Sequence, residues 1–484
     1  MNVVLHWFRR DLRLADNTSL SAAGRCAGRV LPVFILEEPP GPETGAARRA
    51  FLLQTLESLR SRLAAQGCPL LIRSGRAEEV LPRLCAESGA EAVFANKRPE
   101  PRAQARDRRV GEALFSAGVR FQLFKDAVIW EEAELLNQSD RPYTVFTPYA
   151  KAWKPRAVPP PRPAFKPGRR PGPSWPAEPP PAGPAAGGQP PPHPLPPAGE
   201  PSALAVLQRF MAGPVYEYAA RRDRPDLAGT SLLSPHLRAG AIGIRTILRA
   251  LKLAWSTATP AQAAGCDVFL DELIWREFYQ QVLTNFPHVA RGAFRPEYDR
   301  LAWSDNQGHF QAWCQGQTGY PIVDAALRCL NATGFMHNRL RMITAMFLTK
   351  DLLLNWQWGE RYFMQQLVDG DLAANNGGWQ WCAGTGTDAA PYFRIFNPVT
   401  QGEKFDPDGA FVRRWVPELA AFPAGTIHQP WTDSRRYAQS QYPRRVIRHE
   451  IQRARCLAMF KAVRPGPRPN LSAADPDLTP PKGH

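Results

Sequence analysis

The residues best suited to chemistry lie in residues 333–398, where polar, aromatic and glycine residues follow one another in an order that packing alone does not require. The stretch opens with GFMHNRLRM (334–342). On a helix, residues three and four apart share a face, so Asn338, Arg339 and Met342 lie together. This face has the character of a binding site.

The second half of the stretch brings acids and glycines next to indole rings. Two aspartates flank one glycine, and two adjacent glycines precede two tryptophans: Asp369, Asp371, Gly377, Gly378, Trp379 and Trp381. Glycine lets a backbone approach a flat ligand closely. The pattern predicts a site for a planar ring system; the alternative is two buried helices joined by a capped loop.

A second polar and aromatic stripe is predicted on a helix in FLDELIWREFYQQVL (269–283). Glu272, Trp275, Arg276 and Tyr279 have the spacing i, i+3, i+4 and i+7 and therefore share a face. A surface ion pair between the carboxylate and the guanidinium is the simpler alternative.

A phosphate-binding helix start is predicted within GTSLLSPHL (229–237). Ser234 followed by Pro235 is typical of an N-cap and a first helical residue, which leaves free N–H groups at the helix start. Tyr218 and Arg222 lie one turn apart just before this stretch. Capped helix starts are common, so the motif alone does not establish a ligand.

The elements that must position these residues fall into two classes. Residues 1–130 alternate short apolar runs with amphipathic segments, which predicts a doubly wound α/β domain with buried parallel strands at 3–8, 30–36, 69–74, 91–96 and 119–124. No GxGxxG follows the first strand, so a dinucleotide site of that type is not indicated there. From residue 202 onward the pattern is helical.

A proline-rich segment separates the two parts, since 20 of the 50 prolines lie between residues 155 and 201. Such a segment cannot form a core and should be an extended connector; peptide recognition by its PPP runs is the alternative. We therefore expect an α/β domain (1–130), a connector (131–201), a larger all-α domain (202–463) and a polar tail (464–484).

Composition narrows the class of partner. The net charge of +16 and the pI near 9.8 indicate a polyanionic partner, with nucleic acid first, unless the whole proteome is arginine-rich. The eight cysteines include no CxxC pair, so we expect no metal site, no disulfide framework and a cytoplasmic location. No apolar run is long enough to span a membrane.

These motifs resemble the photolyase/cryptochrome family, in particular class I DNA photolyases of the cyclobutane pyrimidine dimer branch. Residues 272–398 resemble the family's flavin domain, and WFRRDLRLADN (7–17) resembles its opening signature. The resemblance implies light-driven repair of dimers in double- or single-stranded DNA by electron transfer from reduced FAD to a flipped-out dimer. A cryptochrome-like blue-light sensor without repair is the alternative, and a nucleic-acid-binding flavoprotein without light chemistry is a third.

The resemblance also assigns site residues. It places around FAD the residues Tyr218, Thr230, Ser231, Leu232, Leu233, Ser234, Phe269, Glu272, Arg276, Asn338, Asp369, Asp371 and Asn375. It places at the DNA or lesion the residues Arg222, Glu272, Trp275, Arg276, Asn338, Arg339, Met342 and Trp381. Catalytic roles fall to Glu272, Asn375, Asn338 and Met342. We expect a monomer.

Three positions bear on which family branch this is. Asn375 matches the position facing the flavin N5 atom, where signalling cryptochromes usually carry aspartate or cysteine, so it favours repair. Asn338 and Met342 stand where the (6-4) branch carries two histidines, which favours cyclobutane dimers as substrate.

Two further features follow from the resemblance. Trp303, Trp356 and Trp379 match a chain of tryptophans that carries an electron to oxidised flavin, although core packing is the ordinary use of such residues. The resemblance does not determine the identity of the antenna chromophore, because Arg102 and Ala103 replace the Asn-Glu pair of folate-binding members. A deazaflavin, a flavin or no antenna remain the alternatives.

Overall fold

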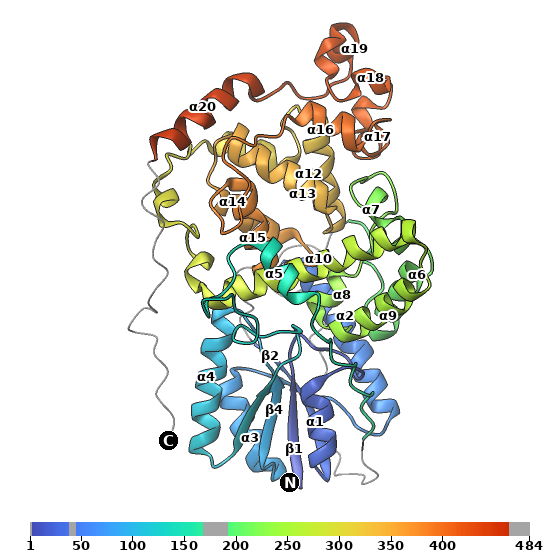
Figure 1. Cartoon of the computed structure of the whole chain (residues 1–484), viewed down its shortest axis with the longest axis vertical. Helices are drawn as coiled ribbons and strands as arrows, with labels where there is room; N and C mark the ends of the chain where they lie inside the picture. Colours follow the sequence, from blue (N-terminus) through green and yellow to red (C-terminus); the bar gives the residue numbers. More distant parts are fainter. Residues whose placement is uncertain (1, 38–44, 168–191, 464–484) are drawn as a thin grey trace.

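The computed structural model describes residues 2–37, 45–167 and 192–463. Its N-terminal part is a parallel five-stranded sheet in the order β3-β2-β1-β4-β5, at the bottom of Figure 1. The strands are β1 (Val3–Phe8), β2 (Arg29–Leu36), β3 (Leu71–Ser74), β4 (Ala92–Asn96) and β5 (Arg120–Phe124). The doubly wound α/β domain is confirmed, with strands at all five expected places.

Helices cover both faces of the sheet, since successive side chains of a strand point to opposite faces. One core joins β1 residues Val4 and Phe8 to α1 (Thr18–Cys26) and α2 (Ala46–Ala65). The other joins Leu5 and Trp7 to α3 (Ala77–Ser88) and α4 (Pro101–Ser116). The expectation that all five strands are buried is wrong for β5, whose residues are exposed or half-buried because it lies at the sheet edge.

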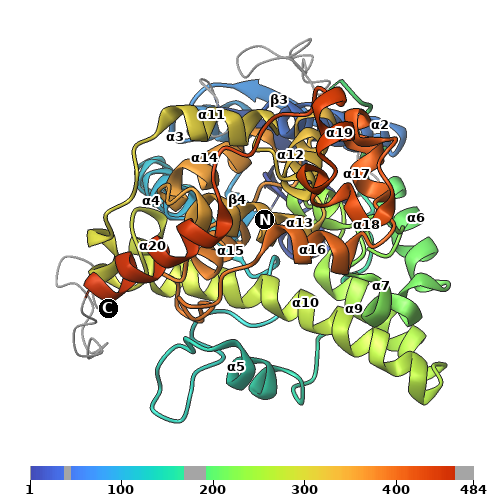
Figure 2. The same cartoon turned by 90° about the horizontal axis from the view of Figure 1, so that it is seen from above.

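The connector carries one helix, α5 (Phe146–Trp153), ahead of its proline-rich segment. This helix packs against α10 (Pro260–Asn285), and Figure 2 shows it on the outer side of α10. Residues 157–167 and 194–198 carry neither helix nor strand, in line with their proline content, whereas 168–191 and the expected tail at 464–484 lie outside the described residues.

The C-terminal part is helical, as expected. Its helices are α6 (Glu200–Met211), α7 (Tyr218–Arg221), α8 (Ser234–Ala239), α9 (Ile244–Ser256), α10 (Pro260–Asn285), α11 (Gln307–Gln315), α12 (Pro321–Thr333), α13 (Asn338–Met346), α14 (Trp356–Gln366), α15 (Leu372–Ala383), α16 (Pro398–Phe405), α17 (Ala410–Trp415), α18 (Ala424–Ile427), α19 (Ser434–Gln439) and α20 (His449–Ala462). None of the helices in the described ranges is long and apolar enough to cross a membrane.

The longest helix, α10, carries the predicted stripe, and its start is encoded locally. Thr259 and Gln262 form a capping box, and Pro260 occupies the first turn, where its missing N–H costs nothing. On the opposite side of the helix, buried Glu277 accepts hydrogen bonds from the amides of Ile129 and Trp130 (2.5 and 3.1 Å) and from the Trp153 indole (2.7 Å). Burial raises the pKa of Glu277, and these bonds oppose that rise. Glu277 therefore ties the connector to α10.

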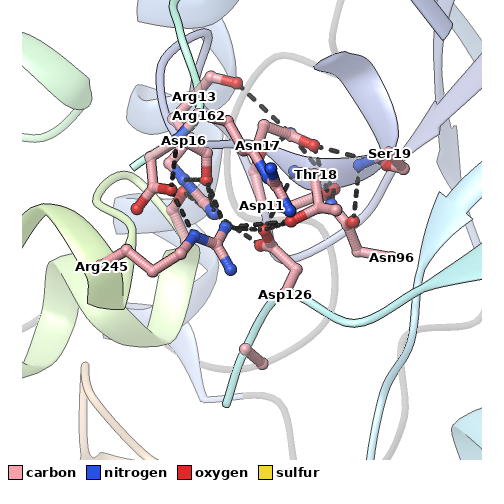
Figure 3. A network of polar contacts seen from close by, with 12 residues as sticks. Asp11, Arg13, Asp16, Asn17, Thr18, Ser19, Asn96, Asp126, Arg162 and Arg245 are labelled. Atoms are coloured by element: carbon pink, nitrogen blue, oxygen red, sulfur yellow. Dashed lines mark hydrogen bonds and ion pairs between the residues drawn. The ribbon is translucent and has the colours of Figure 1, made fainter. Parts of the chain in front are cut away.

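A buried polar network joins the α/β part to α9 (Figure 3). The Asp126 carboxylate forms ion pairs with Arg13, in the loop after β1 (2.5 Å), and with Arg245 of α9 (2.7 Å). Arg245 also bonds Asp16 (2.6 Å), whose carboxylate in turn accepts the amide of Thr246 (3.1 Å). Burial would raise the pKa of Asp126, but the two arginines outweigh it and lower that pKa to about 2.

The opening signature at 7–17 makes contacts both within the α/β part and across its junction with the helical part. Arg10 pairs with Glu100, Asp11 accepts the Asn96 amide (2.6 Å), and Asn17 caps α1. Arg13 additionally donates to the carbonyl of Gly240 in the helical part (3.2 Å).

Candidate functional site

The loop between α14 and α15 meets α8 and α13 at one carboxylate. Asp369 accepts two hydrogen bonds from Arg341 of α13 (3.0 and 2.8 Å) and one from the hydroxyl of Ser234 at the start of α8 (2.6 Å). Two sequence motifs more than a hundred residues apart therefore share one site. Two expected cofactor residues, Asp369 and Ser234, are in direct contact.

Ser234 does not play the capping role expected of it. Leu233 occupies the N-cap position, Ser234 is the first helical residue, and its hydroxyl is turned to Asp369. The preceding residue, Leu232, is 54% exposed and has φ of 55°, in the left-handed region that non-glycine residues seldom adopt. Thr230 and Ser231 complete this exposed turn, in which Ser231 Oγ accepts the Leu233 amide (3.4 Å).

The start of α15 holds two further expected cofactor residues, Asp371 and Asn375. Asp371 is its N-cap and accepts the amide of Ala374 (3.3 Å). One turn later, Asn375 donates from Nδ2 to the carbonyl of Glu360 (3.1 Å), which leaves Oδ1 as the group that can accept from a ligand. A Cβ added to Gly378 would meet nothing within 4 Å, so there is open space beside the helix at that position.

Its neighbour Gly377 serves a different purpose. An added Cβ there would overlap the ring of Tyr279, so this glycine lets α10 and α15 pack closely. Only one of the two adjacent glycines therefore faces free space.

The expected DNA-side residues form a charged row across α7, α10 and α13. Arg222 pairs with Glu272 (2.5 Å), and Arg339 pairs with Asp223 (2.6 Å). Burial lowers the pKa of Arg222, but Glu272 outweighs it and the net shift is upward. Arg339 also reaches Met342 Sδ (3.7 Å), which confirms their shared helix face, and Asn338 is the exposed first residue of α13.

Trp275 is held by an aromatic neighbour from the connector. Its ring stacks on Phe146 at 3.7 Å with an interplanar angle of 6°, and it lies 5.3 Å from Tyr279. Tyr279 and Trp381 line one small cavity with Asp388, which also accepts the Phe146 amide (2.9 Å). Trp275 and Trp381 are thus linked through Tyr279.

Three more of the expected cofactor residues, Phe269, Arg276 and Tyr218, lie on α10 or on α7, which packs against it. Phe269 is buried in a cluster with Tyr218 (5.4 Å) and Phe210 (4.8 Å), where burial raises the pKa of the tyrosine. Arg276 donates to the carbonyl of Ala127 (2.8 Å) and lines a small cavity between the α/β part and the helices. Asp371 lines the same cavity, so Arg276 lies on the cofactor side of α10.

The three tryptophans of the expected chain lie on neighbouring segments. Trp379 is buried against α14, where a Cβ on Gly359 would overlap its indole, and Trp356 lies one turn before that glycine. The amide after Trp303 bonds the carbonyl of Leu353 (2.7 Å), just ahead of Trp356. Trp313, which the motif did not indicate, has its ring 6.1 Å from Trp379.

Three site residues were missed from the sequence. Arg341 lies three residues after Asn338 on the same helix, and Asp223 directly follows Arg222, so spacing could have indicated both. Phe146 had no comparable signal, because its partner Trp275 is far away in the chain.

Comparison with known proteins agrees with this geometry. Residues 4–167 match the family model described as DNA photolyase, and residues 269–462 match the FAD binding domain of DNA photolyase. The chain is 42% identical to deoxyribodipyrimidine photo-lyase of Escherichia coli K12, covering 96% of this chain and 100% of that protein.

Solved structures show the same architecture over nearly the whole chain. A bacterial class III photolyase from Agrobacterium tumefaciens has a TM-score of 0.87 at 37% identity, covering 96% of this chain and 98% of the other. An archaeal photolyase from Sulfolobus tokodaii, solved with two FAD molecules, has a TM-score of 0.79 at 32% identity, covering 95% and 100%. By sequence and by fold, this chain belongs to the DNA photolyase family.

Proposed function

We infer that this protein is a deoxyribodipyrimidine photo-lyase, which uses light and FAD to repair cyclobutane pyrimidine dimers in DNA. The observation that carries this function is the position of α13 between two groups of site residues. Arg339 reaches Asp223, whose neighbour Arg222 pairs with Glu272. Arg341, two residues after Arg339, reaches Asp369 in the loop between α14 and α15. A DNA-side pocket and a cofactor site would then share one helix.

The residues around α15 fit a bound flavin. Gly378 leaves space beside the helix, Asn375 Oδ1 is free to accept a ring N–H, and Asp369 is held in place by two donors. Tyr218, Thr230, Ser231, Leu232 and Leu233 would surround the rest of the cofactor, together with Phe269, Arg276, Asn338 and Asp371. When bound, FAD supplies the light absorption and the single-electron chemistry that ring splitting requires.

The protein's own part is to receive, orient and enclose the dimer. A cyclobutane dimer offers no acidic proton and no leaving group, so the pocket needs few acid or base residues. Trp275, stacked on Phe146, and Trp381 would offer flat apolar surfaces against which flipped bases can stack. Glu272 and Asn338 supply hydrogen-bonding groups, and Met342 supplies a soft apolar surface.

The arginines would bind the phosphate backbone. Arg222 and Arg339 are half-buried at the row of paired charges, and the protein's net charge of +16 favours DNA at long range. Trp303, Trp356 and Trp379 would carry an electron inward from the surface. We further propose the domain division 1–130, 131–201, 202–463 and 464–484, a monomeric protein and a cytoplasmic location.

The function is tested on an oligonucleotide that contains one cyclobutane thymine dimer. The purified protein should restore intact thymines under blue light and not in darkness, with the products measured by chromatography. A protein that retains FAD and responds spectrally to blue light but leaves the dimer intact would instead be a photoreceptor.

Asn375→Ala tests the proposed hydrogen bond to the flavin. We expect the variant to keep FAD but to reoxidise faster in air than the parent after photoreduction, because the accepting Oδ1 is lost. An unchanged rate of reoxidation, measured by absorption, would remove Asn375 from this role.

A further inference from the structure

The loop that carries Asp369 and Asp371 has two carbonyl groups turned toward arginines. Within the loop, the Gly370 amide bonds the carbonyl of Leu367 (3.3 Å), and the Val368 amide bonds that of Gly334 (2.8 Å). The carbonyl oxygens of Leu367 and Gly370 accept further hydrogen bonds from outside the loop. These outside donors add to the bonds of Asp369 with Arg341 and Ser234 in holding the loop.

One of the donors comes from the α/β domain. Arg48 of α2 donates from Nη1 to Leu367 O (3.4 Å) and to Gly370 O (3.3 Å), and its residue is only 8% exposed. Arg238, from α8 of the helical part, donates to the same Gly370 carbonyl (2.6 Å). Guanidinium groups from both parts of the protein therefore meet at one oxygen.

Apolar packing brings the first turns of α2 to this place. Ala47 and Phe51 of α2 form a small core with Ala239 and Val368. The ring of Phe51 also lies edge-on to His236, 5.3 Å away. Because Val368 is in the loop itself, α2 is packed against the same segment that Arg48 bonds.

Gly370 is matched to the Arg48 side chain. A Cβ on Gly370 would overlap Arg48 Nη1, whereas the φ of Gly370 is not among the positive values that favour glycine. Gly370 therefore leaves room for the Arg48 guanidinium, which a side chain at this position would displace.

Arg48 and Arg238 bring two like charges to the carbonyl oxygen of Gly370. Burial and the neighbouring charge of Arg48 together lower the pKa of Arg238 to about 9, while Asp371, at 3.9 Å from Arg238, acts in the opposite direction. The carboxylates of Asp371 and Glu100 oppose the effect of Arg48 on Arg238, and both guanidiniums donate to the Gly370 carbonyl. Loss of the Arg48 guanidinium would therefore change the electrostatic surroundings of Arg238.

We propose that Arg48 is a positioning residue for FAD, through which the α/β domain holds the turn at residues 367–371 in the shape that presents Asp369 and Asp371. The inference rests on the proposed function, because it requires FAD at these two aspartates. Arg48 acts through the loop and does not itself touch the reacting atoms.

The test measures FAD release from the purified holoprotein by the rise of flavin fluorescence after dilution. Arg48→Met should release FAD roughly 10- to 100-fold faster, the range expected for losing charge-assisted hydrogen bonds to a buried carbonyl. Arg48→Lys should recover part of this, since an ammonium keeps the charge but not the planar pair of donors. Arg60→Met is the matched control, because Arg60 lies on the same helix, half exposed, and pairs with Glu57.

A double-mutant cycle separates positioning from general destabilisation. Gly370→Ala should speed FAD release in the parent, where the new methyl displaces Arg48, and should add less than twofold in the Arg48→Ala background. Melting temperatures of all variants are recorded alongside.

The inference is overturned if Arg48→Met and Arg60→Met release FAD at the same rate. It is also overturned if Arg48→Met lowers only the melting temperature, or if Gly370→Ala is equally harmful in both backgrounds. A parent protein that binds no FAD would instead remove the proposed function, and this inference with it.

Discussion

Arginine–carboxylate pairs occur both at the domain junction and at the candidate DNA-side pocket, but in opposite surroundings. At the junction, the side chains of Arg13 and Asp126 are 3% and 4% exposed. At the pocket, those of Arg339 and Asp223 are 17% and 36% exposed. The bond lengths are similar, at 2.5 and 2.6 Å, so burial is what separates the two sets.

Burial changes what such a pair can do. Buried charges are expensive to desolvate, so each must be satisfied by several partners, and removing one partner leaves the rest stranded. Asp126, with its two arginines and the Thr18 amide and hydroxyl, meets that requirement. Half-exposed pairs contribute little and can be exchanged for a phosphate at small cost. The buried pairs at the junction are therefore suited to stabilising the fold. The half-exposed pairs at the pocket are suited to exchanging a carboxylate for a phosphate.

The largest effect should come from removing a junction arginine. Arg245→Met leaves buried Asp16 without its ion-pair partner and Asp126 with Arg13 alone, and should lower the free energy of unfolding by about 3–5 kcal/mol. Urea denaturation followed by circular dichroism measures this. Arg249→Met, one turn further along α9 and exposed, is the control and should stay within about 0.5 kcal/mol. Equal losses in both variants would contradict the special role of the junction.

Acid should weaken the junction within a defined pH range. The pKa of Asp126 is about 2 when folded, below its ordinary value of 3.8, so its contribution is fully present above pH 4 and is lost as the pH falls toward 2. A shift of this size corresponds to on the order of 2 kcal/mol. Urea denaturation of the parent and of Asp126→Asn between pH 5 and pH 2.5 measures it. The stability difference between the two should shrink as the pH falls; a constant difference would contradict the assignment.

Loss of an apolar wall should affect damaged DNA selectively. Trp275→Ala removes one stacking surface and should weaken binding of dimer-containing duplex by roughly 1–3 kcal/mol while leaving intact duplex nearly unchanged. Titrations against both duplexes measure the difference. Equal weakening on the two DNAs would place Trp275 outside the lesion pocket.

The smallest effect should come from the half-exposed row itself. Arg339→Ala should weaken damaged and intact duplexes by similar factors and flatten the salt dependence by about one released counterion. Asp223→Asn frees Arg339 from its partner and should strengthen binding of both damaged and intact duplexes by about two- to fivefold, as expected for a surface pair.

Asp226→Asn is the matched control for the freed arginine. Asp226 lies in the same segment but pairs with Arg224, 2.5 Å away. Salt titrations of the three variants test the row. If Asp223→Asn and Asp226→Asn behave alike, net charge rather than the Arg339 pair governs binding.

Much of the fold could be predicted because its signals are local. Alternating apolar runs indicated all five strands, and the helix start at Thr259 and Pro260 is written in adjacent residues. The spacing of Arg339 and Met342 likewise predicted their shared face. The pattern failed for β5 and for the cap at Ser234, because features remote in the chain decide both. β5 has no neighbouring strand on one side, and the hydroxyl of Ser234 bonds Asp369 instead of capping the helix.

The sequence by itself determined the family, the two-part architecture and a candidate residue set, because long motifs and periodicity survive in the linear order of residues. Only the tertiary structure decided which side chains contact one another. It placed Phe146 on Trp275, turned Arg276 toward the domain junction, and brought Arg48 of the α/β domain to the loop at Gly370. Such pairs join segments more than a hundred residues apart, and their geometry depends on how whole domains pack. No spacing rule along the chain can encode it.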